Sequence, residues 1–405
     1  MVWLQLLACS CASNDDVVVL DSDPPEETEQ QDSPTETATD SPPVDTGPFP
    51  VAVANANPQA GNPPLTVDFD AEGSTVPTGE MQGSWVVDGV AYEGLDVSVE
   101  FLNPGSYLAT LTVTDGPHTV EDDIAVYVRD PDCPAWEHVE WGQVTANQLN
   151  EVSGVVQSRQ DSSVLWVHND AGDDPSVYAL RQDGRLLGTW TLTGAPNGDL
   201  EDIAVGQDDD GHILYVGDVG DNAGGREFIR VYRVVEPTVD TDPVEPVELE
   251  VEVVTMVLRY PDAVSYNSET LFIDPPTQDL YIVTKDYGGK QKLFRKPPPH
   301  APGDYTLEFV LDLDFGKAPL GGGATTGGDI SLDGSLIVVR TYDDDAWLWR
   351  RDESQTVGEA MAEIPCMVQL PIEPQPESVG FSTDGLGLIT ISERPTPLVN
   401  YTLLK

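Results

Sequence analysis

Five carboxylates recur at similar intervals in the last two-thirds of the chain, and they are the residues best suited to chemistry. They are Glu151, Glu201, Glu269, Asp329 and Glu377. Successive members lie 50, 68, 60 and 48 residues apart, and each precedes a short run of small or apolar residues. Carboxylates that a fold brings together repel one another unless protons, basic side chains or a metal ion offset their charge. A ring of such acids could therefore bind a cation or act in general acid–base catalysis.

A second, more hydrophobic run begins about ten residues after each carboxylate, and polar side chains lie where these runs end. If the two runs pair as antiparallel strands, the end of the second lies beside the start of the first. The pattern predicts catalytic candidates at Glu201, Lys285, Arg340 and His168. It also predicts metal ligands, densest in the second repeat, at Asp170, Asp199, Glu201, Asp202, Asp218, Asp221 and Asn222. We therefore expect a site that lies off-centre, between the first two repeats and Lys285.

These residues are compatible with three kinds of role. Glutamate, aspartate and asparagine oxygens are the hard ligands that Ca²⁺ prefers, which favours a site for Ca²⁺ or another ligand without catalysis. A water activated by a metal ion or a carboxylate could instead attack a substrate held by Lys285 and Arg340. In the third interpretation the acids are structural and accept hydrogen bonds from backbone amides of a neighbouring sheet.

The repeats themselves predict an all-β protein with a β-propeller. Intervals of 48 to 68 residues fit blades of about four strands each. The last repeat has room for three strands, so we expect the segment 136–144 to complete its sheet and leave no edge unpaired. Five blades follow from five repeats, and a six-bladed count stays open because the second repeat is long. We assign residues 130–405 to the propeller.

Residues 1–48 have the composition of a targeting segment followed by a tether. Leu6, Leu7, Ala8 and Cys9 resemble a bacterial lipobox, which implies that residues 1–13 are a lipoprotein-type signal and that Cys9 is lipidated. Residues 14–48 are rich in acidic residues, Pro, Ser and Thr, a composition that predicts a disordered tether. This resemblance implies a bacterial cell-envelope location, as an outer-membrane lipoprotein or a secreted protein, with membrane contact only through the lipid.

Residues 49–129 form short alternating strands separated by Gly, Pro and Asp turns, which predicts a small antiparallel sandwich. The run from Pro63 to Ala71, Trp85 followed by Asp88-Gly89, and the run from Leu111 to Asp115 resemble a PKD domain. That family is immunoglobulin-like, and the resemblance implies a spacer or adhesive module in which Trp85 supplies the core aromatic ring.

Residues 149–394 resemble a family of secreted bacterial propellers that are described as phytase-like, TolB-like or WD-like. The resemblance is carried by the run 153–206, by the LYVGDVGDN segment at 214–222 and by the ESVGFS segment at 377–382. It implies a propeller fold and export. It also implies an alternative function, a Ca²⁺-dependent phosphoester or ester hydrolase. A phytase holds phosphate with clustered basic side chains, and here only Lys285, Arg340, His168 and Lys317 are available.

The overall charge restricts the partners. The chain has 71 acidic and 19 basic residues, which gives a formal net charge of −52. Such a surface repels nucleic acid and anionic lipid and favours divalent cations and basic ligands. We expect a monomer that binds a surface ligand, a polysaccharide or a protein. In an exported protein Cys133 and Cys366 are candidates for a disulfide.

Overall fold

The computed structural model describes residues 49–405, except Thr78, Arg129, Asp132, 171–173, Asn197, 316–322, 343–344 and Pro395. The predicted signal segment, Cys9 and the tether at 14–48 lie outside the described residues, as does Lys317. The described chain is all-β, with one short helix, α1 (Val357–Met361). Within these residues no helix has the length and apolar character needed to span a membrane.

Two sheets that share one core occupy residues 49–128. Three strands form one sheet, in the order β1 (Asn55–Asn57), β3 (Leu65–Asp70) and β6 (Val97–Phe101). Five strands form the other, in the order β2 (Ala60–Gly61), β8 (Thr119–Val128), β7 (Gly105–Thr114), β4 (Gln82–Val87) and β5 (Val90–Glu93). In β3, Leu65, Val67 and Phe69 are buried and alternate with more exposed residues, as expected for a strand with one face on a core. Trp85 is fully buried in that core.

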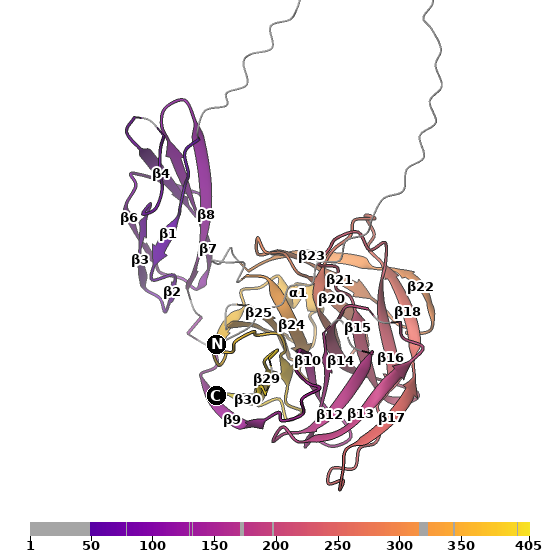
Figure 1. Ribbon diagram of the computed structural model, residues 1–405. Coiled ribbons are helices and arrows are strands. Elements are labelled where there is room, and N and C mark those ends of the chain that lie inside the picture. The colour runs from indigo at the N-terminus through magenta and orange to yellow at the C-terminus, as the bar shows by residue number, and fades with distance from the viewer. Residues whose placement is uncertain are drawn as a thin grey trace, which may run out of the picture. The chain divides into compact units, whose positions relative to one another are not determined.

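From Trp136 onward, the described residues form five sheets, whose strands are labelled in Figure 1. We number these sheets 1 to 5 in chain order. Sheet 1 contains β10 (Val152–Gln157), β11 (Val164–Asn169), β12 (Ser176–Arg181), β13 (Leu186–Thr193) and β17 (Val247–Glu252). Sheet 2 contains β14 (Leu200–Asp208), β15 (Gly211–Asp218), β16 (Ile229–Val235), β18 (Val254–Arg259) and β22 (Gly303–Thr306).

The remaining three sheets have four strands each. Sheet 3 contains β19 (Ser268–Ile273), β20 (Leu280–Thr284), β21 (Lys290–Lys296) and β23 (Glu308–Asp314). Sheet 4 contains β24 (Thr325–Ile330), β25 (Leu336–Thr341), β26 (Asp345–Arg350) and β27 (Cys366–Gln369). Sheet 5 contains β28 (Gly380–Phe381), β29 (Gly387–Ile391), β30 (Leu398–Leu404) and β9 (Trp136–Gln143).

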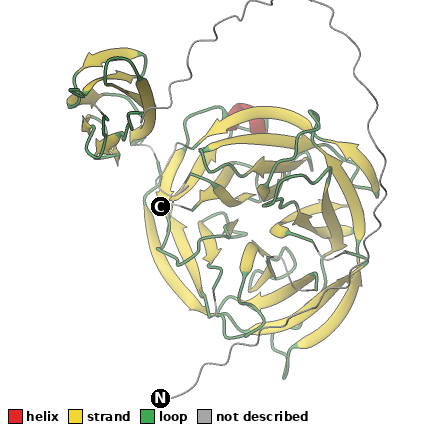
Figure 2. Ribbon diagram, turned by 45° about the horizontal axis from the view of Figure 1, so that its top comes forward, coloured by secondary structure: helices red, strands yellow, loops and turns green. Residues whose placement is uncertain are grey.

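The first strands of the five sheets surround a common centre. Strand β10 contacts β14, β14 contacts β19, β19 contacts β24, β24 contacts β28, and β28 returns to β10. Figure 2 shows the sheets arranged around this centre. All six residues are buried in each of β10, β19 and β24, as expected for strands that are covered on both faces. The architecture is therefore propeller-like.

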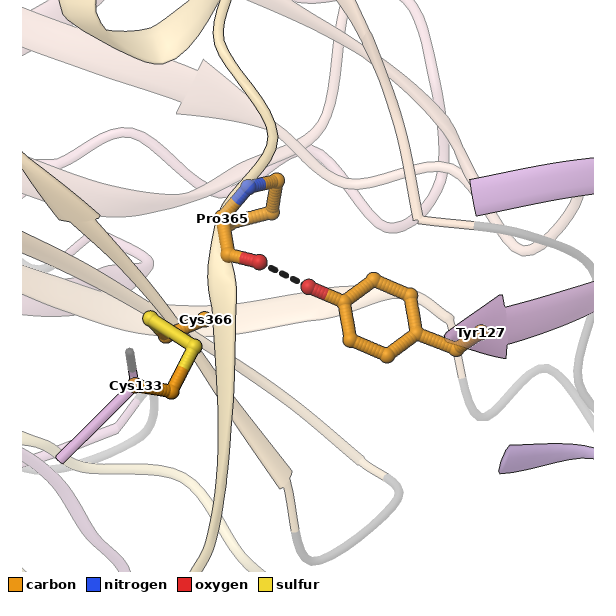
Figure 3. The surroundings of a disulfide bond; sticks show 4 residues. All are labelled: Tyr127, Cys133, Pro365 and Cys366. Atoms are coloured by element: carbon orange, nitrogen blue, oxygen red, sulfur yellow. Dashed lines mark hydrogen bonds between the residues drawn. A yellow bond between two sulfur atoms is a disulfide. The ribbon is translucent and has the colours of Figure 1, made fainter. Parts of the chain in front are cut away.

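Strand β9 connects the two ends of this arrangement. It pairs antiparallel with β30, the last strand of the chain, as the sequence predicts for the segment 136–144. Close to it, Cys133 and Cys366 form a disulfide, with their Cα atoms 5.5 Å apart (Figure 3). Beside the disulfide the hydroxyl of Tyr127 donates a hydrogen bond to the carbonyl oxygen of Pro365. Cys366 is also the first residue of β27, so the disulfide joins sheet 4 to the segment that leads into sheet 5.

The two longest intervals between the recurring carboxylates, of 68 and 60 residues, each contain one additional strand. After β16 the chain leaves sheet 2 and adds β17 in parallel to β13 of sheet 1, before it returns as β18. After β21 it likewise adds β22 in parallel to β18 of sheet 2. The long repeats thus add an outer strand to the preceding sheet, and each still contributes one sheet of its own.

Candidate cation site

Three predicted ligands converge between sheets 1 and 2. Asp170 lies directly after β11, Asp199 directly before β14, and Glu201 is the second residue of β14. One carboxylate oxygen from each residue lies within 4.8 Å of the other two. Oxygens bind Ca²⁺ at about 2.3–2.6 Å, so two ligands of one ion can lie nearly 5 Å apart. We call Asp170, Asp199 and Glu201 the carboxylate triad.

Local backbone geometry places these side chains. The pairing of β14 with β15 shifts register between Leu200 and Asp202, so Glu201 occupies a bulge, a feature that redirects a side chain. The amide of Asp170 donates to the carbonyl oxygen of Glu151 at 2.8 Å, which holds the end of β11 against the start of β10. The backbone at Gly220 passes so close that a Cβ there would overlap Glu201 Oε1 and Asp199 Oδ2. A side chain at position 220 would therefore displace these two carboxylates.

Glu201 is the least satisfied member of the triad. Its side chain is buried, and Oε1 has no hydrogen-bond partner among the described residues. Burial raises the pKa of Glu201 well above its usual value, and the charges of Glu269, Asp170 and Asp199 raise it further. Burial also raises the pKa of Asp199. A divalent cation at this position would supply the missing partner and offset the repulsion.

A second group of charged residues lies nearby and is internally paired. Lys285 Nζ forms an ion pair with Glu269 Oε1 and donates to the hydroxyl oxygen of Tyr342 at 2.8 Å. The hydroxyl of Tyr342 in turn donates to Glu377 Oε1 at 3.0 Å. Burial raises the pKa of Glu269 to about 7 and that of Glu377 to about 8, and Lys285 partly counters both shifts. We call Glu269, Lys285, Tyr342 and Glu377 the lysine cluster.

Tyr342 was not singled out from the sequence, although its position carries a signal. It lies one residue after β25, as Asp170 lies one residue after β11 and Lys285 one residue after β20. The residue that follows the second strand of a sheet therefore contributes to the candidate site in sheets 1, 3 and 4.

Asp202 and Asp329 accept backbone hydrogen bonds from other sheets, as the structural interpretation of the acids expects, although Asp202 was also a predicted metal ligand. Asp202 Oδ2 accepts hydrogen bonds from the amides of Leu271 at 2.8 Å and Gly328 at 3.2 Å, in sheets 3 and 4. Asp329 Oδ2 accepts from the amide of Phe381 in sheet 5, also at 2.8 Å. Asp329 is the fifth residue of β24, so its expected place at the start of a strand is wrong. Both carboxylates join the first strands of different sheets.

The other predicted ligands are occupied by neighbours within the protein. Asp218 is fully buried and forms ion pairs with Arg226 at 2.7 Å and Arg230 at 3.2 Å. Asp221 Oδ2 accepts from the amides of Gly225 and Arg226, each at 2.9 Å. Two further predicted residues lie beside the site. The Asn222 side chain accepts from Asn267, and Glu151 lies directly before β10.

Two catalytic candidates are enclosed by the protein. Arg340 is fully buried, forms an ion pair with Glu373 at 2.7 Å and donates to the carbonyl oxygen of Ser378 at 2.9 Å. His168 is also fully buried, and burial lowers its pKa to about 4. Its Nε2 lies so close to Gly154 that a Cβ there would overlap it. Neither side chain is presented to a substrate in this conformation.

Comparison with known proteins adds little to this geometry. No family model and no curated protein matches the sequence. Among solved structures, the WD40 repeats of RRP9 match with a TM-score of 0.34 and 12% sequence identity. That match covers 68% of this chain and 99% of the other.

Proposed function

We propose that this chain is an exported bacterial surface protein whose propeller binds one Ca²⁺ ion at Asp170, Asp199 and Glu201. The observation that carries the proposal is the convergence of three carboxylate oxygens within 4.8 Å, together with a buried Glu201 Oε1 for which the described residues supply no hydrogen-bond partner. Acidic clusters on a surface are common without an ion. A buried carboxylate oxygen without a partner is costly, which is why it points to a ligand here.

The chemistry of the triad favours Ca²⁺. All three ligands are hard carboxylate oxygens, and Ca²⁺ takes six to eight oxygen ligands in flexible geometry. Three protein residues leave coordination positions for water or for oxygen atoms of a bound surface ligand, such as a polysaccharide or a protein. The formal charge of −52 raises the local concentration of divalent cations and repels anionic competitors.

The surroundings of the propeller support an extracellular role. A disulfide between Cys133 and Cys366 is typical of an oxidising compartment. We infer that the five sheets are the blades of a five-bladed propeller, that residues 49–129 are a PKD-like spacer, and that a lipid on Cys9 anchors the chain. Absence of radiolabelled palmitate on the expressed full-length chain would contradict the anchor.

Binding is better supported than hydrolysis of a phosphoester. Arg340 is fully buried, and Lys285 is engaged by Glu269 and Tyr342, so neither is available to hold a phosphate. Among the described residues, the triad is the one group of three metal-ligating side chains that converges.

A calcium titration tests the proposal. At pH 8 we expect Ca²⁺ to raise the melting temperature of the parent protein and to bind with a stoichiometry of one by calorimetry. A ligand at about 100 times its Kd stabilises the folded state by about 2.7 kcal/mol. Glu201→Gln should lose most of this response, because it removes the buried charge and keeps the shape.

The matched control is Glu248→Gln, which changes an exposed carboxylate in β17. It should respond to Ca²⁺ like the parent. If the parent shows neither a melting shift nor binding heat, or if Glu201→Gln responds like Glu248→Gln, the triad is not a calcium site.

A further inference from the structure

Lys285 is a buried ammonium group among the acids of the candidate site. The exposed fraction of its side chain is 3%, and that of its ion-pair partner Glu269 is 4%. A buried ammonium is strongly unfavourable unless it is paired and hydrogen-bonded. Here Glu269 supplies the opposite charge and the hydroxyl of Tyr342 accepts a hydrogen bond at 2.8 Å.

Aromatic rings complete the surroundings of this ammonium. Nζ lies 4.5 Å from the ring centroid of Tyr342 and 5.6 Å from that of Tyr287, which are distances at which a cation is attracted to an aromatic ring. Because Tyr342 also donates to Glu377, the positive charge is linked to two carboxylates, one from sheet 3 and one beside sheet 5. The ammonium group of Lys285 is therefore surrounded by the groups that a bound cation would need, namely carboxylate and hydroxyl oxygens and aromatic rings.

We propose that Lys285 is a tethered cation that occupies a second cation site, formed by Glu269 and Glu377. The lysine cluster then needs no free ion. The protein binds one exchangeable ion, at the carboxylate triad, and would bind a second ion at Glu269 and Glu377 if the lysine were absent. The expected stoichiometry of one exchangeable ion rests on the proposed function, the calcium site at the triad. The occupation of the second site by Lys285 does not.

The two sites are close enough to interact. The charge of Glu269 is, after burial, the largest cause of the raised pKa of Glu201, and Lys285 acts on Glu201 in the opposite direction. Removal of the lysine would leave Glu269 and Glu377 without the ammonium that pairs with them, close to the carboxylates of the triad and to Glu393, whose charge also raises the pKa of Glu377. Protons or a second divalent cation must then replace the ammonium.

Counting bound calcium in a Lys285→Met variant tests this inference. Methionine keeps an unbranched side chain of similar length and removes the charge. At pH 8, equilibrium dialysis with radioactive calcium should give one ion per parent chain and two per Lys285→Met chain. The double variant Lys285→Met with Glu269→Gln should return to one ion, because it removes a ligand of the second site.

Lys292→Met is the matched control. It removes a lysine that pairs with Asp312, and both of these side chains are substantially exposed, at 34% and 71%. It should leave the stoichiometry at one. The double variant also controls for folding, since it removes the charge pair as a unit, so near-ultraviolet circular dichroism should show it folded without calcium.

The outcomes separate this inference from the proposed function. No ion in the parent and one in Lys285→Met would overturn the calcium triad and support the tethered cation. One ion in both would support the triad and overturn the tethered cation. A Lys285→Met chain that binds no more calcium than the parent also overturns the inference. This holds if Lys285→Met is folded, and equally if it is unfolded and only the double variant with Glu269→Gln is folded.

Discussion

Glu201 and Asp202 are adjacent in the sequence and have opposite roles. Glu201 joins the carboxylate triad with an oxygen that lacks a partner among the described residues, whereas Asp202 accepts three backbone hydrogen bonds, from Ile203, Leu271 and Gly328. The sequence predicted both as metal ligands. It could not distinguish them, because the amides that occupy Asp202 come from strands 69 and 126 residues away.

This difference predicts opposite effects of neutral substitutions on stability. Without calcium at pH 8, Glu201→Gln should raise the urea concentration at the unfolding midpoint, because it replaces a buried carboxyl that has no hydrogen-bond partner for Oε1 among the described residues. Asp202→Asn should lower the free energy of unfolding by about 1–3 kcal/mol, because an asparagine offers one acceptor oxygen where the carboxylate offers two. Asp202→Asn should still bind one Ca²⁺. Equal losses of stability in both variants would show that Glu201 is a structural residue like Asp202.

The lysine cluster predicts how stability depends on pH. The pKa of Glu269 is raised from 4.5 to about 7 and that of Glu377 from 4.5 to about 8 in the folded protein. At these two carboxyls the folded state binds more protons than the unfolded state between about pH 4.5 and 8, so their contribution makes the free energy of unfolding fall as pH rises. Asp329, whose pKa burial raises to about 6, acts in the same direction, and His168, whose pKa burial lowers to about 4, opposes it below about pH 6.5. In the presence of a chelator, we expect a lower melting temperature at pH 8.5 than at pH 5.5.

Glu377→Gln should flatten this profile, because one of the groups with a raised pKa is then absent. Most exposed carboxylates are already ionised at pH 5.5, so they add little to the change between the two pH values. A parent protein that melts at a higher temperature at pH 8.5 than at pH 5.5 would contradict the raised pKa values.

At the scale of strands and sheets, the repeat could be predicted from the sequence, but the additional parallel strands could not. Each predicted carboxylate region does contribute the first strand of one sheet, and β9 pairs with β30 as expected. The parallel strands β17 and β22 were not foreseen, because their pairing partners belong to the preceding sheet. The β17 sequence, VELEVE, does alternate apolar and acidic residues, but nothing in it identifies the sheet that it joins, and β22 (GDYT) shows no alternation.

The position of Asp329 shows a second limit at this scale. Strand β24 begins at Thr325, and its third and fourth residues are Gly327 and Gly328. Glycine is depleted in strands, so this part of the sequence resembled a loop, and the strand was expected to begin later. The acid therefore lies near the end of its strand, and the ring of five carboxylates is incomplete. Instead, the acids form two groups, the triad at sheets 1 and 2 and the lysine cluster at sheets 3, 4 and 5.

The whole molecule carries a large excess of negative charge, which has consequences beyond the site. With 71 acidic and 19 basic residues, most acidic side chains cannot have a basic partner. Among the described residues, both partners are buried in the ion pairs of Arg340 with Glu373, Lys285 with Glu269 and Arg351 with Asp274, and the other ion pairs are partly exposed. Repulsion among the unpaired charges opposes the compact state and is weakened by salt, because screening shortens the range of the interaction.

We therefore expect two separable responses to salts. Raising KCl from 10 mM to 1 M shortens the screening length from about 30 Å to about 3 Å and should raise the melting temperature progressively. Calcium should stabilise the parent further at fixed ionic strength, because it binds at the triad as well as screening charge. Glu201→Gln should keep the full response to KCl and lose the additional response to Ca²⁺. If CaCl₂ and KCl at equal ionic strength raise the melting temperature equally in the parent, then calcium acts only as a screening ion, and the specific site is refuted.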